Sequence, residues 1–305
     1  MKNIQNGYFY NQLFLLLLPP LYTGVLFSRD VWDKKSLLRS ENFICAILIL
    51  PGLFHIIVNL DKFIFQSFNI LYSKSPFESG LSHLMGLVFV FAIVRKKSWL
   101  ILPSILLLFL LSKRIAILSS IIILTTLVVV RTFPKKIRWS ITICCIFLMN
   151  LSFICVVYDI VYGDILDSLT RFYFGISLDA FAMGRLGIYS NLSALANYKS
   201  LLFGNGIGHV NLYLRNFPQY EGLGYNPHSD VLRLMLEFGI LLFITWFYFL
   251  YQSFTALKNY RYLFFPLYIN MLMLTDNVIL YHYVTVPFFT LSFISFKIQL
   301  LESED

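Results

Sequence analysis

Long apolar runs alternate with short polar segments along most of this chain. A run of about 17 to 25 mainly apolar residues is long enough to cross a bilayer as a helix. Continuous runs rich in Leu, Ile and Phe are typical of membrane helices, whereas the strands of a membrane barrel alternate. The pattern therefore predicts an all-α, polytopic integral membrane protein with about nine transmembrane helices. The predicted spans lie near residues 8–27, 43–60, 79–94, 98–112, 114–130, 139–158, 231–254, 262–280 and 284–298.

The first of these runs resembles a signal peptide, because Lys2 precedes an apolar core. A signal peptide ends in a cleavage site of small residues, but here Pro19, Pro20 and Tyr22 follow the core. We therefore expect this segment to stay on the protein as a kinked first span.

The distribution of basic residues predicts the orientation of the spans. More than half of the 24 lysines and arginines fall in short loops near residues 29–39, 95–97, 131–138 and 258–261 and at Lys297. Alternation of the spans puts all of these on one side, which the positive-inside rule makes cytoplasmic. The N-terminus and the one long hydrophilic stretch, 159–228, then lie outside. We expect a single integral membrane domain, 1–305, with this periplasmic loop as its catalytic part.

Composition excludes several other classes of protein. The chain is 58% hydrophobic and only 13% charged, and its net charge of +8 is explained by the orientation bias. No basic patch with interleaved aromatic residues stands out, so we expect no nucleic-acid partner. The four cysteines fall inside predicted spans without the spacing of metal ligands, so we expect no metal and no cofactor; they are Cys45, Cys144, Cys145 and Cys155.

Two cations interrupt this charge pattern. Lys113 and Arg114 lie in a tight Leu-Leu-Ser-Lys-Arg turn that is predicted to be external, where the orientation rule disfavours them. One interpretation is an anion site for a phosphate or pyrophosphate, since arginine offers a planar fork of donors. The other is that both side chains reach the membrane interface without a ligand. The residues alone leave both interpretations open.

The external loop contributes further cations and two amphipathic segments. Arg185 opens a predicted helix over 185–196 whose apolar residues recur at helical spacing, so the helix is suited to a membrane surface. A cation at a helix N-terminus is unfavourable unless it helps to bind an anion, and the alternative is a solvated surface arginine. Arg171 and Arg215 are the other candidate substrate-binding cations. A second amphipathic stretch gives the loop the character of a lid; its apolar residues are Leu166, Leu169, Phe172 and Tyr173.

Two short motifs follow along the loop. Gly204-Asn205-Gly206-Ile207-Gly208 resembles a phosphate-binding loop, but no strand precedes it and no Lys-Ser or Lys-Thr follows it. We therefore expect a tight turn there.

The second motif, Asn226-Pro227-His228-Ser229-Asp230, enters the next apolar run. Ser229 or Asp230 is expected to cap the helix. His228, just before it, is free to face a substrate, and the alternative is a capping or interfacial histidine. Asp230, Arg233 and Glu237 share one helix face, and Arg233 and Glu237 are spaced to form an ion pair. Asp276 and Asn277 are a further polar pair inside a predicted span, and they can line the same cavity.

These motifs occur in a recognisable order. A Ser-Lys-Arg turn opens a helix, Gly-Arg stands early in a long external loop, and Leu-Leu-Phe-Gly-Asn-Gly-Ile-Gly follows. Pro-His-Ser-Asp-Val-Leu-Arg-Leu-Met-Leu-Glu-Phe-Gly-Ile-Leu then completes the series. Over roughly residues 100–255 the chain resembles the O-antigen polymerase and ligase family of bacterial envelopes. It departs from the family pattern in its shorter length and in lacking a glycine after Gly-Ile-Leu.

The resemblance implies a helical fold like that of lipid-dependent glycosyltransferases in the bacterial inner membrane. It implies metal-independent transfer of a polyprenyl-diphosphate-linked oligosaccharide. The sequence leaves open whether a chain-length regulator is a further partner. Arg114, Arg185 and His228 match the family's functional arginines and histidine. The arginines would neutralise the diphosphate and His228 would take the proton of the acceptor. Lys113, Arg171, Arg215, Asp230 and Arg233 are the predicted substrate-binding residues.

We favour a polysaccharide polymerase over an O-antigen ligase, which transfers finished glycan to the lipid A core. A transporter or flippase remains an alternative, although no repeat symmetry is visible. The carboxylates of the loop are scattered, which disfavours a glycoside hydrolase.

Overall fold

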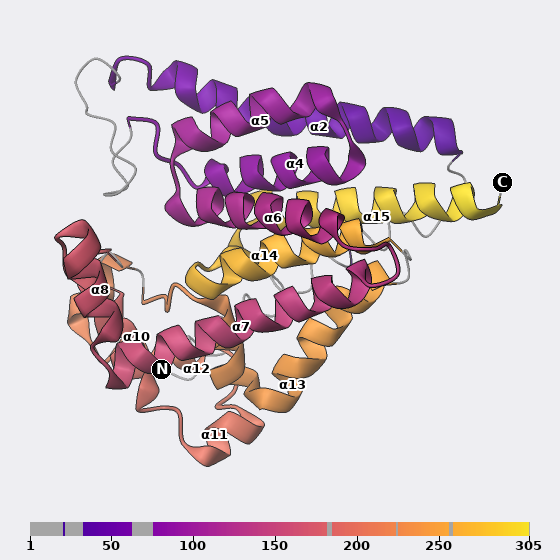
Figure 1. The fold of residues 1–305 in the computed structure, drawn as a ribbon. Coiled ribbons are helices and arrows are strands. Elements are labelled where there is room, and N and C mark those ends of the chain that lie inside the picture. Colours follow the sequence, from indigo (N-terminus) through magenta and orange to yellow (C-terminus); the bar gives the residue numbers. More distant parts are fainter. Residues whose placement is uncertain are drawn as a thin grey trace. The chain divides into compact units, whose positions relative to one another are not determined.

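The computed structural model describes residues 21, 33–62, 76–181, 185–223, 225–255 and 259–304. These residues form helices and turns, and the described part contains no β-strand. Figure 1 labels the helices along the chain, and the described part divides into two compact units. Unit 1 contains residues 143–249 and 273–277, and unit 2 contains the remaining described residues up to 142, then 250–272 and 278–304. Whether the chain acts as one integral domain stays a prediction.

Unit 2 contains most of the long apolar helices. Asp33 caps the first of them, because its carboxylate accepts a hydrogen bond of 3.2 Å from the Ser36 amide. The next two helices end at Lys96 and Ser112, which adopt left-handed backbone conformations and turn the chain back. The helices are α2 (Lys34–Val58), α4 (Leu81–Arg95), α5 (Ser98–Leu111), α6 (Arg114–Thr132) and α15 (His282–Glu304). Short 3₁₀ segments also belong here, η2 (Tyr260–Leu263) and η3 (Val278–Leu280).

Three helices cross the boundary between the units along the chain. They are α7 (Arg138–Tyr162), α13 (Asp230–Thr255) and α14 (Phe264–Thr275). Unit 1 adds a series of short helices: α8 (Ile165–Phe174), α9 (Leu178–Phe181), α10 (Leu186–Ser193), α11 (Tyr198–Phe203), α12 (His209–Leu214) and η1 (Pro218–Leu223).

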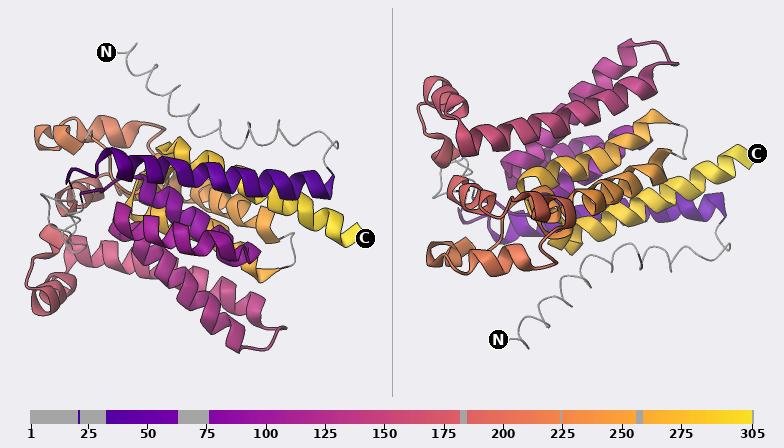
Figure 2. Two further views of the ribbon diagram at one scale, coloured as in Figure 1. Left: turned by 90° about the horizontal axis from the view of Figure 1, so that it is seen from above. Right: turned by 90° about the horizontal axis from the view of Figure 1, so that it is seen from below.

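The central helix of unit 2 is α4. It is apolar on every side and almost entirely buried, as expected for a helix with neighbours all round. It packs against α2, α5, α6 and α15 (Figure 2). Gly86 allows one of these close approaches, because a β-carbon there would lie 2.0 Å from the Tyr268 hydroxyl. That hydroxyl donates to the His83 carbonyl at 2.9 Å and so ties α14 to α4.

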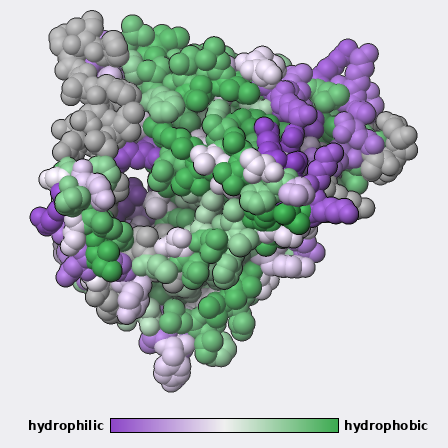
Figure 3. All heavy atoms as spheres, viewed as in Figure 1, coloured by the Kyte–Doolittle hydropathy of each residue, from purple (hydrophilic) through white to green (hydrophobic). Residues whose placement is uncertain are grey.

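Eight of the nine predicted spans coincide with helices, and the span at 8–27 lies outside the described residues except for Leu21. By length and composition, four described helices are candidate membrane spans: Lys34–Val58, Arg114–Thr132, Asp230–Gln252 and His282–Glu302. Leu81–Arg95, Ser98–Leu111 and Arg138–Ser152 are apolar but shorter. Green apolar residues cover much of the face in Figure 3. The number of nine crossings and the periplasmic side of the loop stay predictions.

A buried ion cluster joins two helices of unit 2. The Glu41 side chain on α2 is fully buried and accepts a hydrogen bond of 2.7 Å from Nε of Arg95. Nζ of Lys97 lies 2.9 Å from its other oxygen, and Arg95 Nη1 donates to the Tyr262 hydroxyl at 2.9 Å. Two of the basic residues that set the predicted orientation therefore also have a structural role.

We expect Glu41→Gln to destabilise the protein strongly. The change leaves two partly buried cations without a carboxylate, and losing one partner of a buried pair costs about 3–5 kcal/mol. Glu302→Gln is the matched control, since Glu302 and Lys34 are 3.9 Å apart and about half exposed. Such a surface pair contributes about 0–1 kcal/mol. The midpoint of thermal unfolding in detergent should be clearly lower for Glu41→Gln than for Glu302→Gln. Equal unfolding midpoints for the two variants would contradict a stabilising role of the buried ion cluster.

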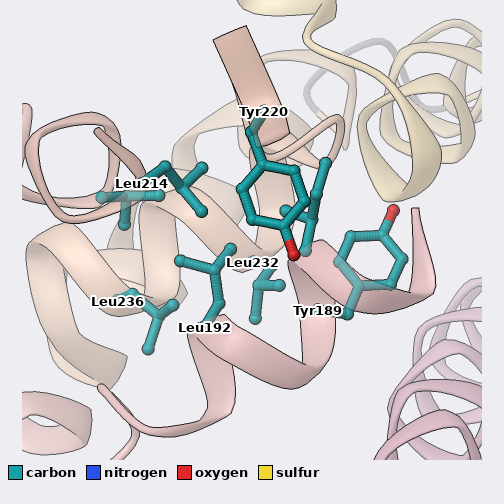
Figure 4. Close-up of a cluster of buried hydrophobic side chains, with 8 residues drawn as sticks. Tyr189, Leu192, Leu214, Tyr220, Leu232 and Leu236 are labelled. Carbon is teal, nitrogen blue, oxygen red and sulfur yellow. The ribbon is translucent and has the colours of Figure 1, made fainter. Parts of the chain in front are cut away.

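The stretch that was predicted as an external loop is folded. Its helix α10 and helix α12 pack with α13 around a buried cluster in unit 1 (Figure 4). Ile188 and Leu192 of α10 are completely buried in this cluster. The prediction that the apolar face of this helix suits a membrane surface is therefore wrong, because protein already covers that face. The cluster contains Ile188, Tyr189, Leu192, Val210, Leu214, Tyr220, Leu232 and Leu236.

Candidate active site

The start of α13 places His228 at the centre of a group of polar residues. The Ser229 hydroxyl accepts a hydrogen bond of 3.2 Å from the Leu232 amide, which is the predicted helix cap. His228, one residue earlier, has a left-handed backbone with φ of 52°. Such a conformation is strained for a residue with a side chain, and strain of this kind gathers at functional sites.

The chain returns to His228 at the end of α14. Oδ1 of Asp276 lies 4.0 Å from Nδ1 of His228, and the Asp276 carbonyl accepts a hydrogen bond of 3.2 Å from the Asp230 amide. Asp276, Asn277 and Asp230 are all buried. Asp276 therefore lies beside His228. That Asn277 lines the same cavity stays a prediction.

Arg185 and Tyr189 approach the same group from α10. Nη1 of Arg185 donates a hydrogen bond to the carbonyl of Thr275, the neighbour of Asp276. The Tyr189 hydroxyl donates to the His228 carbonyl at 3.2 Å. Burial raises the pKa of Tyr189 to about 12, so this hydroxyl stays protonated and remains a donor. Two predicted catalytic residues, Arg185 and His228, are thus held in one place.

Several buried polar atoms of this site lack a hydrogen-bond partner among the described residues. They are both ring nitrogens of His228, the Thr275 hydroxyl and the side-chain oxygen of Asn277. Buried polar groups are normally paired, and exceptions are typical of functional sites that receive a ligand or water. The arrangement offers a base, a neighbouring carboxylate and a guanidinium, which are the groups that acid-base chemistry on an anionic substrate requires. No group of three metal-binding side chains gathers within the described ranges.

The Arg233 and Glu237 ion pair forms as predicted, with Nε and Oε2 3.3 Å apart. The other Glu237 oxygen accepts a hydrogen bond of 3.3 Å from the Val210 amide. Arg233 and Glu237 are both buried. The pair therefore fastens α13 to the start of α12 as well as stabilising its own helix.

The glycine motif closes against a break in α13. At Gly239 the backbone leaves the helix, with φ of 75° and ψ of 168°. The amides of Asn205 and Gly206 donate to the Leu236 and Glu237 carbonyls at 2.9 and 3.0 Å. These bonds satisfy carbonyls that the break releases. The expected tight turn is confirmed, with positive φ at Gly204, Gly206 and Gly208.

Lys113 and Arg114 belong to unit 2, where the predicted turn begins α6 at Arg114. Nζ of Lys113 lies 2.6 Å from Oε1 of Glu78, and the Lys113 amide donates to the Ser82 hydroxyl at 3.3 Å. Glu78 therefore compensates the positive charge of Lys113, which the orientation rule disfavours on the external side. Sequence analysis missed this partner. Its position 35 residues earlier gave no local signal.

The other predicted substrate-binding cations lie elsewhere in unit 1. Arg171 is an exposed residue of α8 that pairs with Asp167 at 2.6 Å, and Arg215 follows the last turn of α12. Tyr189 was missed by sequence analysis, although its spacing of four residues from Arg185 puts both on one helix face.

Comparison with known proteins agrees with the motifs. Residues 99–247, about half of the chain, match the O-antigen ligase family model. Members of this family are glycosyltransferase-like polymerases and ligases, and together with the apolar helices the match indicates a multi-pass membrane protein. None of the curated proteins compared with the chain matches it. The matched range contains Arg114, Arg185 and His228, whereas Asp276 lies beyond it. Residues 99–247 of this chain therefore belong to the O-antigen ligase family.

Proposed function

We propose that the protein is a polysaccharide polymerase that transfers polyprenyl-diphosphate-linked oligosaccharide units onto a growing glycan at the periplasmic face of the bacterial inner membrane. The observation that carries this proposal is the meeting of His228, Asp276 and Arg185 in unit 1. A base beside a carboxylate and a guanidinium suits a reaction in which an alcohol attacks and a diphosphate leaves.

In the proposed reaction the acceptor hydroxyl attacks the anomeric carbon of the donor sugar. The new glycosidic C–O bond forms as the bond between that carbon and the diphosphate oxygen breaks. The hydroxyl proton passes to Nε2 of His228, and the electron pair of the broken bond stays on the diphosphate. Asp276 lies on the Nδ1 side, so its carboxylate orients the imidazole and stabilises its charged form. The separation of 4.0 Å would shorten when substrate is bound, as is common for catalytic contacts.

Arginines are suited to the diphosphate, because their planar donors match phosphate oxygens and keep their charge. Arg185 is the proposed diphosphate ligand in unit 1. Arg114 of unit 2 is proposed separately as a phosphate-binding residue. Neutralisation by arginine would let the transfer proceed without a metal. Arg171, Arg215, Asp230 and Arg233 remain proposed substrate contacts, although Arg171 and Arg233 already have carboxylate partners.

A ligase that moves finished glycan onto the lipid A core is the second candidate. The description of the matching family as O-antigen ligase favours it. Both reactions use the same bond changes and differ in the acceptor, so the acceptor distinguishes them.

A strain that lacks the gene tests both candidates through its surface-polysaccharide ladder. Core that carries one repeat unit, restored to long chains by the wild-type gene, supports the polymerase. Bare core with long polymer on the carrier lipid supports the ligase. An unchanged ladder, together with no transfer by the purified protein in liposomes that contain the lipid-linked oligosaccharide, would contradict both.

A further inference from the structure

Helix α8 presents its apolar side outward. Ile165, Leu169, Phe172 and Tyr173 follow the helical spacing of one face and are 69%, 44%, 80% and 70% exposed. The polar Thr170, by contrast, is buried. A helix of a soluble protein is normally oriented the other way, with its apolar side toward the interior. The outward face therefore needs an apolar surrounding.

Hydrogen bonds from the first turn of α8 join it to the helices on either side of it along the chain. The Leu166 amide at its start donates to Oδ2 of Asp159 on α7 at 2.8 Å. Oδ1 of Asp167 accepts from the Leu178 amide of α9 at 2.7 Å, and Oδ2 accepts from Arg171. Because the bonds to Asp159 and Leu178 join α8 to other helices, rotating its apolar face inward would break them.

The preceding helix continues this apolar surface along the chain. On α7, Phe147, Leu148 and Tyr158 are 65%, 52% and 66% exposed. The C-terminal end of α7 connects to α8 through only Gly163 and Asp164. In a multi-pass membrane protein, the surroundings that suit an exposed apolar helix such as α7 are lipid.

The length and charge of α8 specify how it would meet lipid. Ten residues of helix extend about 15 Å, half the thickness of the hydrocarbon core, so α8 is too short to cross it. Phe and Tyr are suited to the headgroup boundary. Asp167 and Arg171 neutralise each other on the same helix, so attraction to anionic lipid contributes little.

We propose that α8 lies in the membrane interface, with Ile165, Leu169, Phe172 and Tyr173 inserted at the boundary between headgroups and acyl chains. This helix would fix the folded loop of unit 1 at the depth of the bilayer surface. The inference depends on the membrane character of the chain and not on glycosyl transfer.

The test uses Phe172→Trp in vesicles whose acyl chains are brominated, with Glu221→Trp as the matched control. Both positions are exposed in unit 1, but Glu221 is a charged residue of η1, where the exposed Gln219 lies two residues before it. The emission of each variant is measured after subtraction of the wild type, which has four tryptophans. We expect about half or more of the added Phe172→Trp emission to be quenched and the Glu221→Trp emission to be unchanged.

Vesicles of neutral phosphatidylcholine and vesicles with added anionic lipid should quench Phe172→Trp equally. Quenching that requires anionic lipid would overturn the apolar mechanism. If Phe172→Trp emission is not quenched but is blue-shifted in a way that depends on protein concentration, the apolar face of α8 contacts a second copy of the chain. Emission that shifts only when polyprenyl diphosphate is added would assign it to the donor lipid, and either result would overturn insertion into the bilayer.

Discussion

His228→Ala is expected to abolish glycan extension while leaving a folded, membrane-inserted protein. General-base catalysis typically contributes about 10²–10⁴-fold to a rate, and the substitution removes the imidazole that lies 4.0 Å from Asp276. Neither ring nitrogen has a hydrogen-bond partner among the described residues, so the substitution removes no side-chain hydrogen bond. The rate of transfer by the purified variant and the ladder of the complemented strain would both show the loss.

His209→Ala is the matched control for that variant. His209 begins α12 in the same unit, and we expect its replacement to leave the ladder unchanged.

Asp276→Asn keeps the shape of the side chain but removes the charge that stabilises the imidazolium, so a partial loss of rate is expected. Arg185→Ala and Arg114→Ala should each abolish extension without preventing insertion. A normal ladder from His228→Ala would contradict a base at this position.

Gly204→Ala and Gly239→Ala are each expected to prevent accumulation of folded protein. Both glycines have ψ near 170° at positive φ, a region that only glycine occupies readily. A β-carbon at Gly204 would lie 2.2 Å from the Glu237 carbonyl oxygen, and one at Gly239 would lie 2.4 Å from that of Leu202. Backbone atoms have no rotamer to relieve such contacts, so the cost exceeds about 4 kcal/mol.

Gly206→Ala separates backbone strain from steric overlap. Gly206 also has a positive φ, of 92°, but nothing lies within 4 Å of its β-carbon position. Its replacement by alanine should cost only about 1–2 kcal/mol. The yield of monodisperse protein in detergent measures the difference, and similar yields for Gly204→Ala and Gly206→Ala would show that the close approach to α13 is unimportant.

The helices were predictable because a long apolar run has few other stable states in a membrane. The Arg233 and Glu237 pair was predictable for a similar reason, since their spacing of four residues makes them neighbours on any helix. The cap from Ser229 and the turn at Gly204 likewise depend on local geometry. In each case the signal and the structure involve the same few residues.

What the sequence left undetermined depends on contacts between distant residues. Periodicity indicated apolar faces on α8 and α10, but only packing decides that α10 is covered by protein and that α8 is open. The approach of Asp276 to His228 requires the chain to return after the whole of α13 and α14. A polar pair inside an apolar run does not indicate which residue it will contact. Glu41 and Arg95, 54 residues apart, illustrate the same limit.

Because Glu41 precedes Arg95 by 54 residues, the two partners of the buried ion cluster are synthesised at different times. A ribosome adds about 5–20 residues per second, so roughly 3 to 11 s pass between the appearance of Glu41 and that of Arg95. During this interval α2 carries a carboxylate whose final partner does not yet exist. Until α4 is made, Glu41 lacks the cations that balance its charge in the folded protein, so α2 is expected to be held less firmly in the bilayer. A nascent chain stalled between the two should therefore release α2 from the bilayer more readily than one stalled after Lys97.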